Sequence, residues 1–196
     1  MTVSTRSKSP VESQNQNDSR TDQQLIAAIN AGDVAAFEVL YFRYRDWVVG
    51  LAYRFAGDED LALDVLQETF LYFLRKFPGF RLTANLKTFL YPAVRNLTIA
   101  ARRKAGRYQS TEAEQNQLEQ LPGADGPVAS GNELAVALAN LSEDHREVLL
   151  LRYVDGLTLA EIAEAADVPL GTVKSRLHNA LETLRQDKGA RQFFEE

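Results

Sequence analysis

Cysteine is absent from this chain of 196 residues, and histidine occurs only at His145 and His178. Without cysteine the protein can form no disulfide, no thiol nucleophile and no zinc site with sulfur ligands. Two histidines are too few for a histidine-rich metal centre. Long apolar runs are also absent, since no stretch approaches the ~20 apolar residues that a membrane-spanning helix needs. We therefore expect no membrane insertion, no metal and no other cofactor.

Residues 1–20 have few apolar side chains and are rich in Ser, Gln, Asn and Thr. They lack the apolar core of a secretory signal peptide, so we expect a cytoplasmic protein. Their composition also predicts a disordered tail. Hydrophobic residues nevertheless make up 45% of the whole chain, which is enough to build cores elsewhere and argues against global disorder.

Acidic side chains are missing from one long window of the chain. The net charge of −5 by itself opposes nucleic-acid binding, yet residues 69–111 contain no Asp or Glu. Residues 108–145, in contrast, hold seven acidic side chains and no Lys or Arg. Most charge runs are solvated helix faces, but a basic segment of this length also suits a phosphate backbone. The window holds nine basic residues: Arg75, Lys76, Arg81, Lys87, Arg95, Arg102, Arg103, Lys104 and Arg107.

Apolar residues recur at helical spacing from residue 21 to about residue 104. Asp33 is placed to cap one helix, and Asp58 or Asp60 to cap the next. That next helix is expected to run to about Phe77, and a last helix to cover about residues 85–104 with Pro92 inside it. The expected apolar face of the helix that ends near Phe77 consists of Leu63, Leu66, Phe70, Phe73 and Leu74.

The remaining segments complete a two-domain plan. Residues 106–131 contain four Gly and two Pro without sustained periodicity, which predicts a flexible acidic linker. Helical patterns return over residues 132–187, and no strand-like alternation occurs anywhere. The prediction is an all-α protein with helical domains at residues 21–105 and 132–187 and a tail at residues 188–196.

Residues 157–184 have the pattern of a helix-turn-helix. Thr158 and Glu161 form a capping box at the start of a short helix, and residues 167–169 predict the turn. The second helix has a polar face that could bind phosphates and base edges in the major groove. A plain helical hairpin is the alternative. The polar face consists of Thr172, Lys174, Ser175, Arg176, His178 and Asn179.

Two segments, in the right order, resemble the extracytoplasmic-function group of bacterial sigma-70 family sigma factors. Residues 141–153, followed by residues 156–158 and 171–177, resemble the C-terminal sigma domain, whose helix-turn-helix is similar to that of response regulators. Residues 64–77 (DVLQETFLYFLRKF) resemble the polymerase-binding helix. They are followed at family spacing by Phe80-Arg81, by residues 86–96 and by the basic run at residues 102–104. The resemblance covers about residues 21–105 and 132–187.

The resemblance implies a transcription initiation factor rather than an enzyme. Its partners would be core RNA polymerase, promoter DNA and an anti-sigma factor, with no small-molecule substrate. The residues implied for core polymerase are Asp64, Gln67, Glu68, Phe70 and Leu71. Those implied for the −10 element, including a loop for a flipped base, are Phe80, Arg81, Asn85, Lys87, Thr88, Arg95, Asn96, Arg102 and Arg103. Lys174, Ser175, His178 and Asn179 would read the −35 element, with Thr172 and Arg176 nearer phosphates.

Three positions depart from the family pattern. Phe89 stands where the family commonly has Trp, and Pro92 stands where it commonly has a basic residue. The loop at residues 82–84 lacks the usual Gly and acidic residue. These departures bear on the −10 sequence preference and leave the implied role in place. The rival interpretation is a stand-alone helix-turn-helix regulator, which would bind duplex DNA tightly without polymerase.

Overall fold

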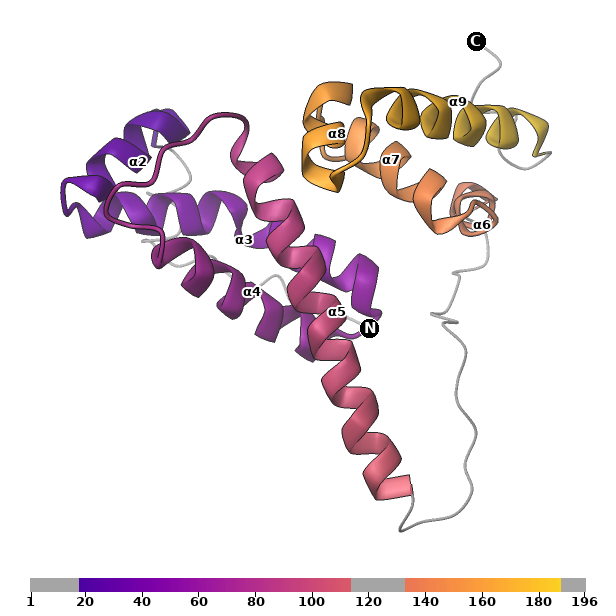
Figure 1. Cartoon of the computed structure of the whole chain (residues 1–196), viewed down its shortest axis with the longest axis horizontal. Helices are drawn as coiled ribbons and strands as arrows, with labels where there is room; N and C mark the ends of the chain where they lie inside the picture. Colours follow the sequence, from indigo (N-terminus) through magenta and orange to yellow (C-terminus); the bar gives the residue numbers. More distant parts are fainter. Residues whose placement is uncertain (1–17, 114–132, 188–196) are drawn as a thin grey trace, which may run out of the picture. The chain divides into compact units, whose positions relative to one another are not determined.

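The computed structural model describes residues 18–113 and 133–187, and within these ranges it contains only helices (Figure 1). The described residues form two compact units, one before and one after the gap. This confirms the predicted all-α fold with two helical domains. The rest of the predicted N-terminal tail (residues 1–17), most of the predicted linker (residues 114–131) and the predicted tail at residues 188–196 lie outside the described residues.

Four helices make up the first unit: α2 (Asp22–Asn30), α3 (Val34–Ala56), α4 (Glu59–Leu74) and α5 (Leu86–Ala113). Helices α3, α4 and α5 pack against one another, and α2 packs on α3. The predicted cap Asp33 accepts a hydrogen bond from the Ala36 amide, and Asp58, rather than Asp60, caps α4. The largest fully buried side chains of this unit are Tyr91, Phe73, Leu25, Leu40, Leu86 and Leu90.

Two helix ends were predicted wrongly. Helix α4 ends at Leu74 instead of near Phe77, since the chain turns before Pro78 and a residue before proline disfavours helical backbone. Helix α5 continues past residue 104 to Ala113, because the single Gly106 costs only ~1 kcal/mol within an established helix. The expected apolar face of α4 was also too wide, since Leu63 and Leu74 are 43% and 45% exposed.

The second unit contains α6 (Glu133–Ala139), α7 (Glu143–Tyr153), α8 (Leu159–Ala166) and α9 (Leu170–Gln186). Its helix-turn-helix is α8 and α9, and α9 packs against both α7 and α8. The predicted capping box is present: Glu161 accepts from the Thr158 amide, and Thr158 accepts from the Glu161 amide. Asp167 follows α8 with a left-handed φ of 54°, a conformation that Asp tolerates better than most residues.

Arg146 of α7 holds the preceding helix in place. Its guanidinium donates to the carbonyl oxygens of Leu138, Ala139 and Leu141, at 2.7, 2.7 and 3.0 Å. Leu138 and Ala139 are the last residues of α6, where backbone acceptors have no partner within the helix, and Leu141 lies just beyond it. Arg146 is therefore a structural cation and does not belong to the DNA-binding set. A hydrophobic core of this unit is formed by Ala137, Leu141, Leu149, Ala180 and Leu184.

Candidate nucleic-acid interface

The predicted polymerase-binding residues lie on α4 and separate into exposed and buried members. Asp64, Gln67, Glu68 and Leu71 are exposed, and they share one helical face. Phe70 is only 5% exposed and contacts the rings of Phe37 and Tyr41. The surface of α4 therefore presents two acids, an amide and a leucine, while Phe70 supports that helix from the core.

An aromatic cluster fills the space beneath the loop between α4 and α5. The ring of Phe80 lies 4.7 Å from that of Phe89, 5.4 Å from Phe73 and 5.6 Å from Phe77, centroid to centroid. Phe80 is half-buried, so it belongs partly to the core and partly to the surface. Beside it, α2 and residues 80–82 line a cavity of about 230 Å³. Arg81 is exposed at this cavity.

Helix α5 carries the predicted polar and basic residues along its length. Arg95, Asn96, Arg102 and Arg103 are exposed, and pairs seven residues apart return to the same helical face. Arg102 also donates to the carbonyl oxygen of Phe55 at 3.1 Å. That carbonyl lies in the last turn of α3, where a cation is favourable.

The start of α5 has its own local contacts. The Asn85 side chain accepts from the Lys87 amide at 2.9 Å, and thus caps this helix. The Lys87 ammonium lies 5.7 Å from the centroid of the Trp47 ring. The helix continues across Pro92, which is half-buried.

One residue that the resemblance implied for the −10 element, Thr88, lies in the core. Thr88 is 3% exposed, and its hydroxyl makes no hydrogen bond to any residue that the structure describes. Tyr91, three residues further along α5, is also fully buried. Helix α5 packs against α3 and α4 at once, and the Tyr91 ring contacts the ring of Phe55 in α3. A resemblance assigns a role to a position without showing whether neighbouring helices cover it. We therefore remove Thr88 from the candidate surface.

The polar face predicted for the second helix of the helix-turn-helix is formed by α9. Lys174, Ser175, His178 and Asn179 are exposed, and Thr172 is half-buried. The opposite face buries Val173, Ala180 and Leu184. Arg176 is already paired: its guanidinium lies 2.5 Å from the Asp144 carboxylate at the start of α7. The pair fixes α9 to α7 and leaves Arg176 24% exposed.

Sequence reasoning missed a contact that holds the loop. The last residue of α2, Asn30, bonds the backbone of Gly79 and Phe80 through its side-chain amide. No local pattern signals this contact, because the partners are about fifty residues apart. The assignment of Arg176 to phosphates has a similar cause. Its partner Asp144 lies thirty-two residues before it, so no local pattern signals that Arg176 is paired.

Two family models match the chain. The model described as Sigma-70 region 2 matches residues 40–108, and that described as Sigma-70, region 4 matches residues 137–186. The first match lies within the unit that carries the aromatic cluster, and the second covers the helix-turn-helix. Together they span more than half of the chain, in the order that the sequence predicted.

Curated relatives are similar over most of the chain. The ECF RNA polymerase sigma factor SigW of Bacillus subtilis is 32% identical over 174 residues, covering 82% of this chain and 93% of the relative. The ECF RNA polymerase sigma-E factor of Escherichia coli K12 is 31% identical over 177 residues, covering 84% and 92%. Relatives with both regions disfavour the rival interpretation, a stand-alone helix-turn-helix regulator.

Solved structures share the fold. The sigma factor RpoE of Bartonella quintana, solved with the anti-sigma factor NepR, is 24% identical with a TM-score of 0.58, covering 78% of this chain and 96% of that one. CnrH, solved with the cytosolic domain of CnrY, is 22% identical with a TM-score of 0.59, covering 83% and 93%. The matches to both sigma-70 regions and the curated relatives place this chain in the extracytoplasmic-function group of the sigma-70 family: it is an RNA polymerase sigma factor.

Proposed function

We propose that the two units divide promoter recognition between them, the first binding core RNA polymerase and the −10 element and the second binding the −35 element. The observation that carries this proposal is the accessibility of the implied residues. All of them except Phe70 and Thr88 are exposed or half-buried, and they group on α4, on the loop with α5, and on α9.

The polymerase-binding surface is the exposed face of α4, formed by Asp64, Gln67, Glu68 and Leu71. Its acids complement a basic partner, and Leu71, 46% exposed, adds apolar area. Mixed surfaces of this kind are common in protein–protein interfaces, where apolar contact provides affinity and charge provides orientation. Exposed Leu63 and Leu74 extend the apolar area of the same helix.

The −10 surface joins the loop to α5. Arg81, Lys87, Arg95, Arg102 and Arg103 supply positive charge for phosphates. Phe80 and the adjoining cavity would receive a base taken out of the stack, because aromatic side chains stack on bases of any sequence. Asn85 and Asn96 supply the amides of this surface, and Asn96 lies between the cations of α5.

The −35 surface is the exposed face of α9. Lys174, Ser175, His178 and Asn179 can reach base edges in the major groove, where each base pair presents a distinct pattern of donors and acceptors. Thr172 lies on the phosphate side. Arg176 reaches a phosphate only if it leaves Asp144, so we assign it first to holding α9 on α7.

An anti-sigma factor is the remaining partner in this proposal. One structural neighbour was solved with such a factor, and the exposed apolar residues of α4 offer a docking area on this chain. The chain would act by binding alone, in the cytoplasm where polymerase works. Across residues 18–113 and 133–187, no helix is long and apolar enough to cross a membrane.

The test combines Asp64→Ala with Gln67→Ala in the full chain. The double variant should lose about tenfold or more in affinity for core polymerase, because the minority of interface residues that cost more than 1 kcal/mol on truncation cluster near the interface centre, where this proposal places Asp64 and Gln67. Its thermal stability should be retained, since both side chains are exposed. Binding to purified core polymerase and promoter-specific run-off transcription are the two measurements.

Glu38→Ala is the matched control, because it removes one exposed carboxylate from α3 instead of α4. It should leave polymerase binding unchanged. Equal loss in both variants would contradict the assignment of α4, whereas failure of the unmodified chain to support transcription from any promoter would overturn the proposed function itself.

A further inference from the structure

The Asn30 side chain connects α2, the first helix in the part of the chain that the structure describes, to the −10 loop. Asn30 is the last residue of α2, and its amide nitrogen donates to the Phe80 carbonyl oxygen at 2.8 Å. Its amide oxygen accepts from the Gly79 backbone nitrogen at 2.6 Å. One carboxamide thus bonds the backbone of two consecutive loop residues, and Asn30 lies outside the residues 40–108 matched by the family model.

The −10 loop, residues 75–85, needs hydrogen bonds from another part of the chain to fix its backbone. It has no regular secondary structure after the last turn of α4, so helix or sheet hydrogen bonds do not fix its backbone. Gly79 has a φ of 104°, which residues with a Cβ rarely adopt. A carboxamide that offers both a donor and an acceptor replaces the backbone pairing that a regular element would supply.

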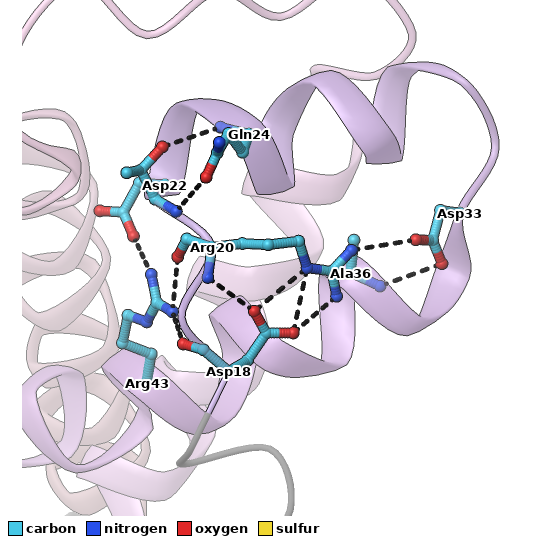
Figure 2. A network of polar contacts seen from close by, with 8 residues as sticks. Asp18, Arg20, Asp22, Gln24, Asp33, Ala36 and Arg43 are labelled. Carbon is cyan, nitrogen blue, oxygen red and sulfur yellow. Dashed lines mark hydrogen bonds and ion pairs between the residues drawn. The ribbon is translucent and has the colours of Figure 1, made fainter.

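The two hydrogen bonds from the Asn30 carboxamide to Gly79 and Phe80, here called the clamp, can fix the loop only if α2 is itself fixed. Figure 2 shows the contacts that hold the N-terminal end of α2. The Arg43 guanidinium of α3 lies 2.6 Å from the Asp22 carboxylate and also donates to the carbonyl oxygens of Asp18 and Arg20, each at 3.0 Å (Figure 2). Tyr44 of α3 donates to the same Asp22 carboxylate. Helix α2 is therefore tied to α3 at one end and to the loop at the other.

The cavity beside Phe80 is formed by both partners of the clamp. Gln23, Ile26 and Asn30 of α2 line one side, and Phe80, Arg81 and Leu82 line the other. Separation of the loop from α2 would open this cavity and release the Phe80 backbone. The Phe80 ring would then keep only its contacts with other aromatic rings. Those contacts hold the ring in the cluster but do not hold the Phe80 backbone in place.

We propose that Asn30 is a positioning residue for −10 recognition: it holds the loop against α2 so that Phe80 and the adjoining cavity have the shape that a flipped base requires. This inference rests on the proposed function, because it assigns a determinant of the same −10 surface. Asn30 itself need not contact DNA.

The experiment measures opening of the −10 region by holoenzyme assembled from the full chain, with 2-aminopurine in the promoter as the probe. Asn30→Ala removes both hydrogen bonds and should reduce opening about tenfold. Asn30→Asp keeps the acceptor for the Gly79 amide but sets a carboxylate oxygen against the Phe80 carbonyl. It should be at least as defective as Asn30→Ala, although Asp and Asn are nearly isosteric.

Gln24→Ala is the matched control. It removes the Gln24 half of the capping box at the other end of α2, where the Gln24 side chain accepts from the Thr21 amide at 2.8 Å. It therefore weakens the same helix without touching the loop, and it should change opening by no more than about twofold. Amide hydrogen exchange at Gly79 should accelerate in Asn30→Ala, which removes the acceptor of that amide, and not in Gln24→Ala.

Core polymerase affinity and −35 duplex binding should be unchanged in all three variants. Equal opening defects in Asn30→Ala and Gln24→Ala at equal thermal stability would reduce Asn30 to a general stabiliser of α2 and overturn the proposal. Normal opening by both Asn30 variants would overturn it as well. If the unmodified chain opened no promoter, the proposed function would be at fault, and unchanged Gly79 exchange in Asn30→Ala would still refute the clamp.

Discussion

The two units build their candidate DNA surfaces in different ways. The −35 surface of α9 lies within residues 172–179 of a single helix, and its neighbours α7 and α8 immediately precede it. The −10 surface combines a loop, a long helix and a clamp from α2, and the clamp residues are about fifty positions apart. The first unit is therefore sensitive to remote changes, whereas the second depends chiefly on local helix signals.

The difference also appears in how charged groups are used. In the second unit the guanidiniums of Arg146 and Arg176 stabilise the fold, one on the carbonyls at the end of α6 and one on Asp144. In the first unit Arg43 likewise ties α2 to α3, but the predicted −10 cations of α5 stay exposed or half-buried. A count of basic residues therefore overstates the DNA-binding charge of each unit by the guanidiniums that hold its helices together.

The largest expected effect is selective loss of the first unit. Tyr91→Ala should destabilise it by ~3–5 kcal/mol, since removal of a large buried ring leaves a cavity. The second unit has its own core, so its unfolding transition and −35 binding should persist. Calorimetry with a −35 duplex titration measures both.

Tyr91→Phe is the control for this prediction. The Tyr91 hydroxyl is buried and bonds to no residue in the part of the chain that the structure describes, so its removal should be neutral or slightly stabilising. A single unfolding transition that shifts in Tyr91→Ala would show that the two units unfold together and are not independent.

Next in size is the effect of Lys174→Ala on the second unit. Loss of a good base contact should weaken −35 binding by ~1–3 kcal/mol and relax the preference at one base pair. Thermal stability should hold, because Lys174 is exposed. Binding to a panel of single-substituted duplexes measures both quantities. A loss that is uniform across the panel would reassign Lys174 to the phosphate backbone.

Smaller effects come from the two capping boxes, one in each unit. Thr21→Ala and Thr158→Ala each remove a side-chain acceptor from a helix N-terminus and should each cost ~1 kcal/mol. Their functional consequences should differ: Thr158→Ala weakens −35 binding, and Thr21→Ala leaves it unchanged. Thermal denaturation with −35 titration tests the pair. Identical −35 losses would mean that the units are coupled.

The smallest expected effect concerns the contacts near the start of α2. Hydrogen bonds from the Arg20 side chain and backbone lower the pKa of Asp18 from 3.8 to about 2. A carboxyl group with a lowered pKa stabilises the fold fully above its ordinary pKa, and this contribution is lost as the pH falls from 3.8 towards 2. NMR titration of the Asp18 carboxyl should give a midpoint near 2. A midpoint near 3.8 would show that the Arg20 contact does not form in solution.

Local residue patterns predicted much of this molecule. Thr158 with Glu161, Asp33 and Asp58 cap helices where the sequence placed them, because capping needs only a side chain and an amide two or three residues away. Periodicity predicted the polar face of α9, since that face also depends only on residues a few positions apart. Thr88 was assigned to the −10 element from the resemblance, and its burial follows from the packing of α5 on α3 and α4, which no local pattern shows.

Residues close together in the chain were enough to predict most of the helices, the caps at Asp33 and Thr158, the helix-turn-helix and the resemblance to the family. Packing between helices settles which cations of residues 69–111 face solvent, that Arg176 pairs with Asp144, and that Asn30 holds Gly79 and Phe80. A side chain at one position can select a backbone group dozens of residues away only after the core has brought the two together.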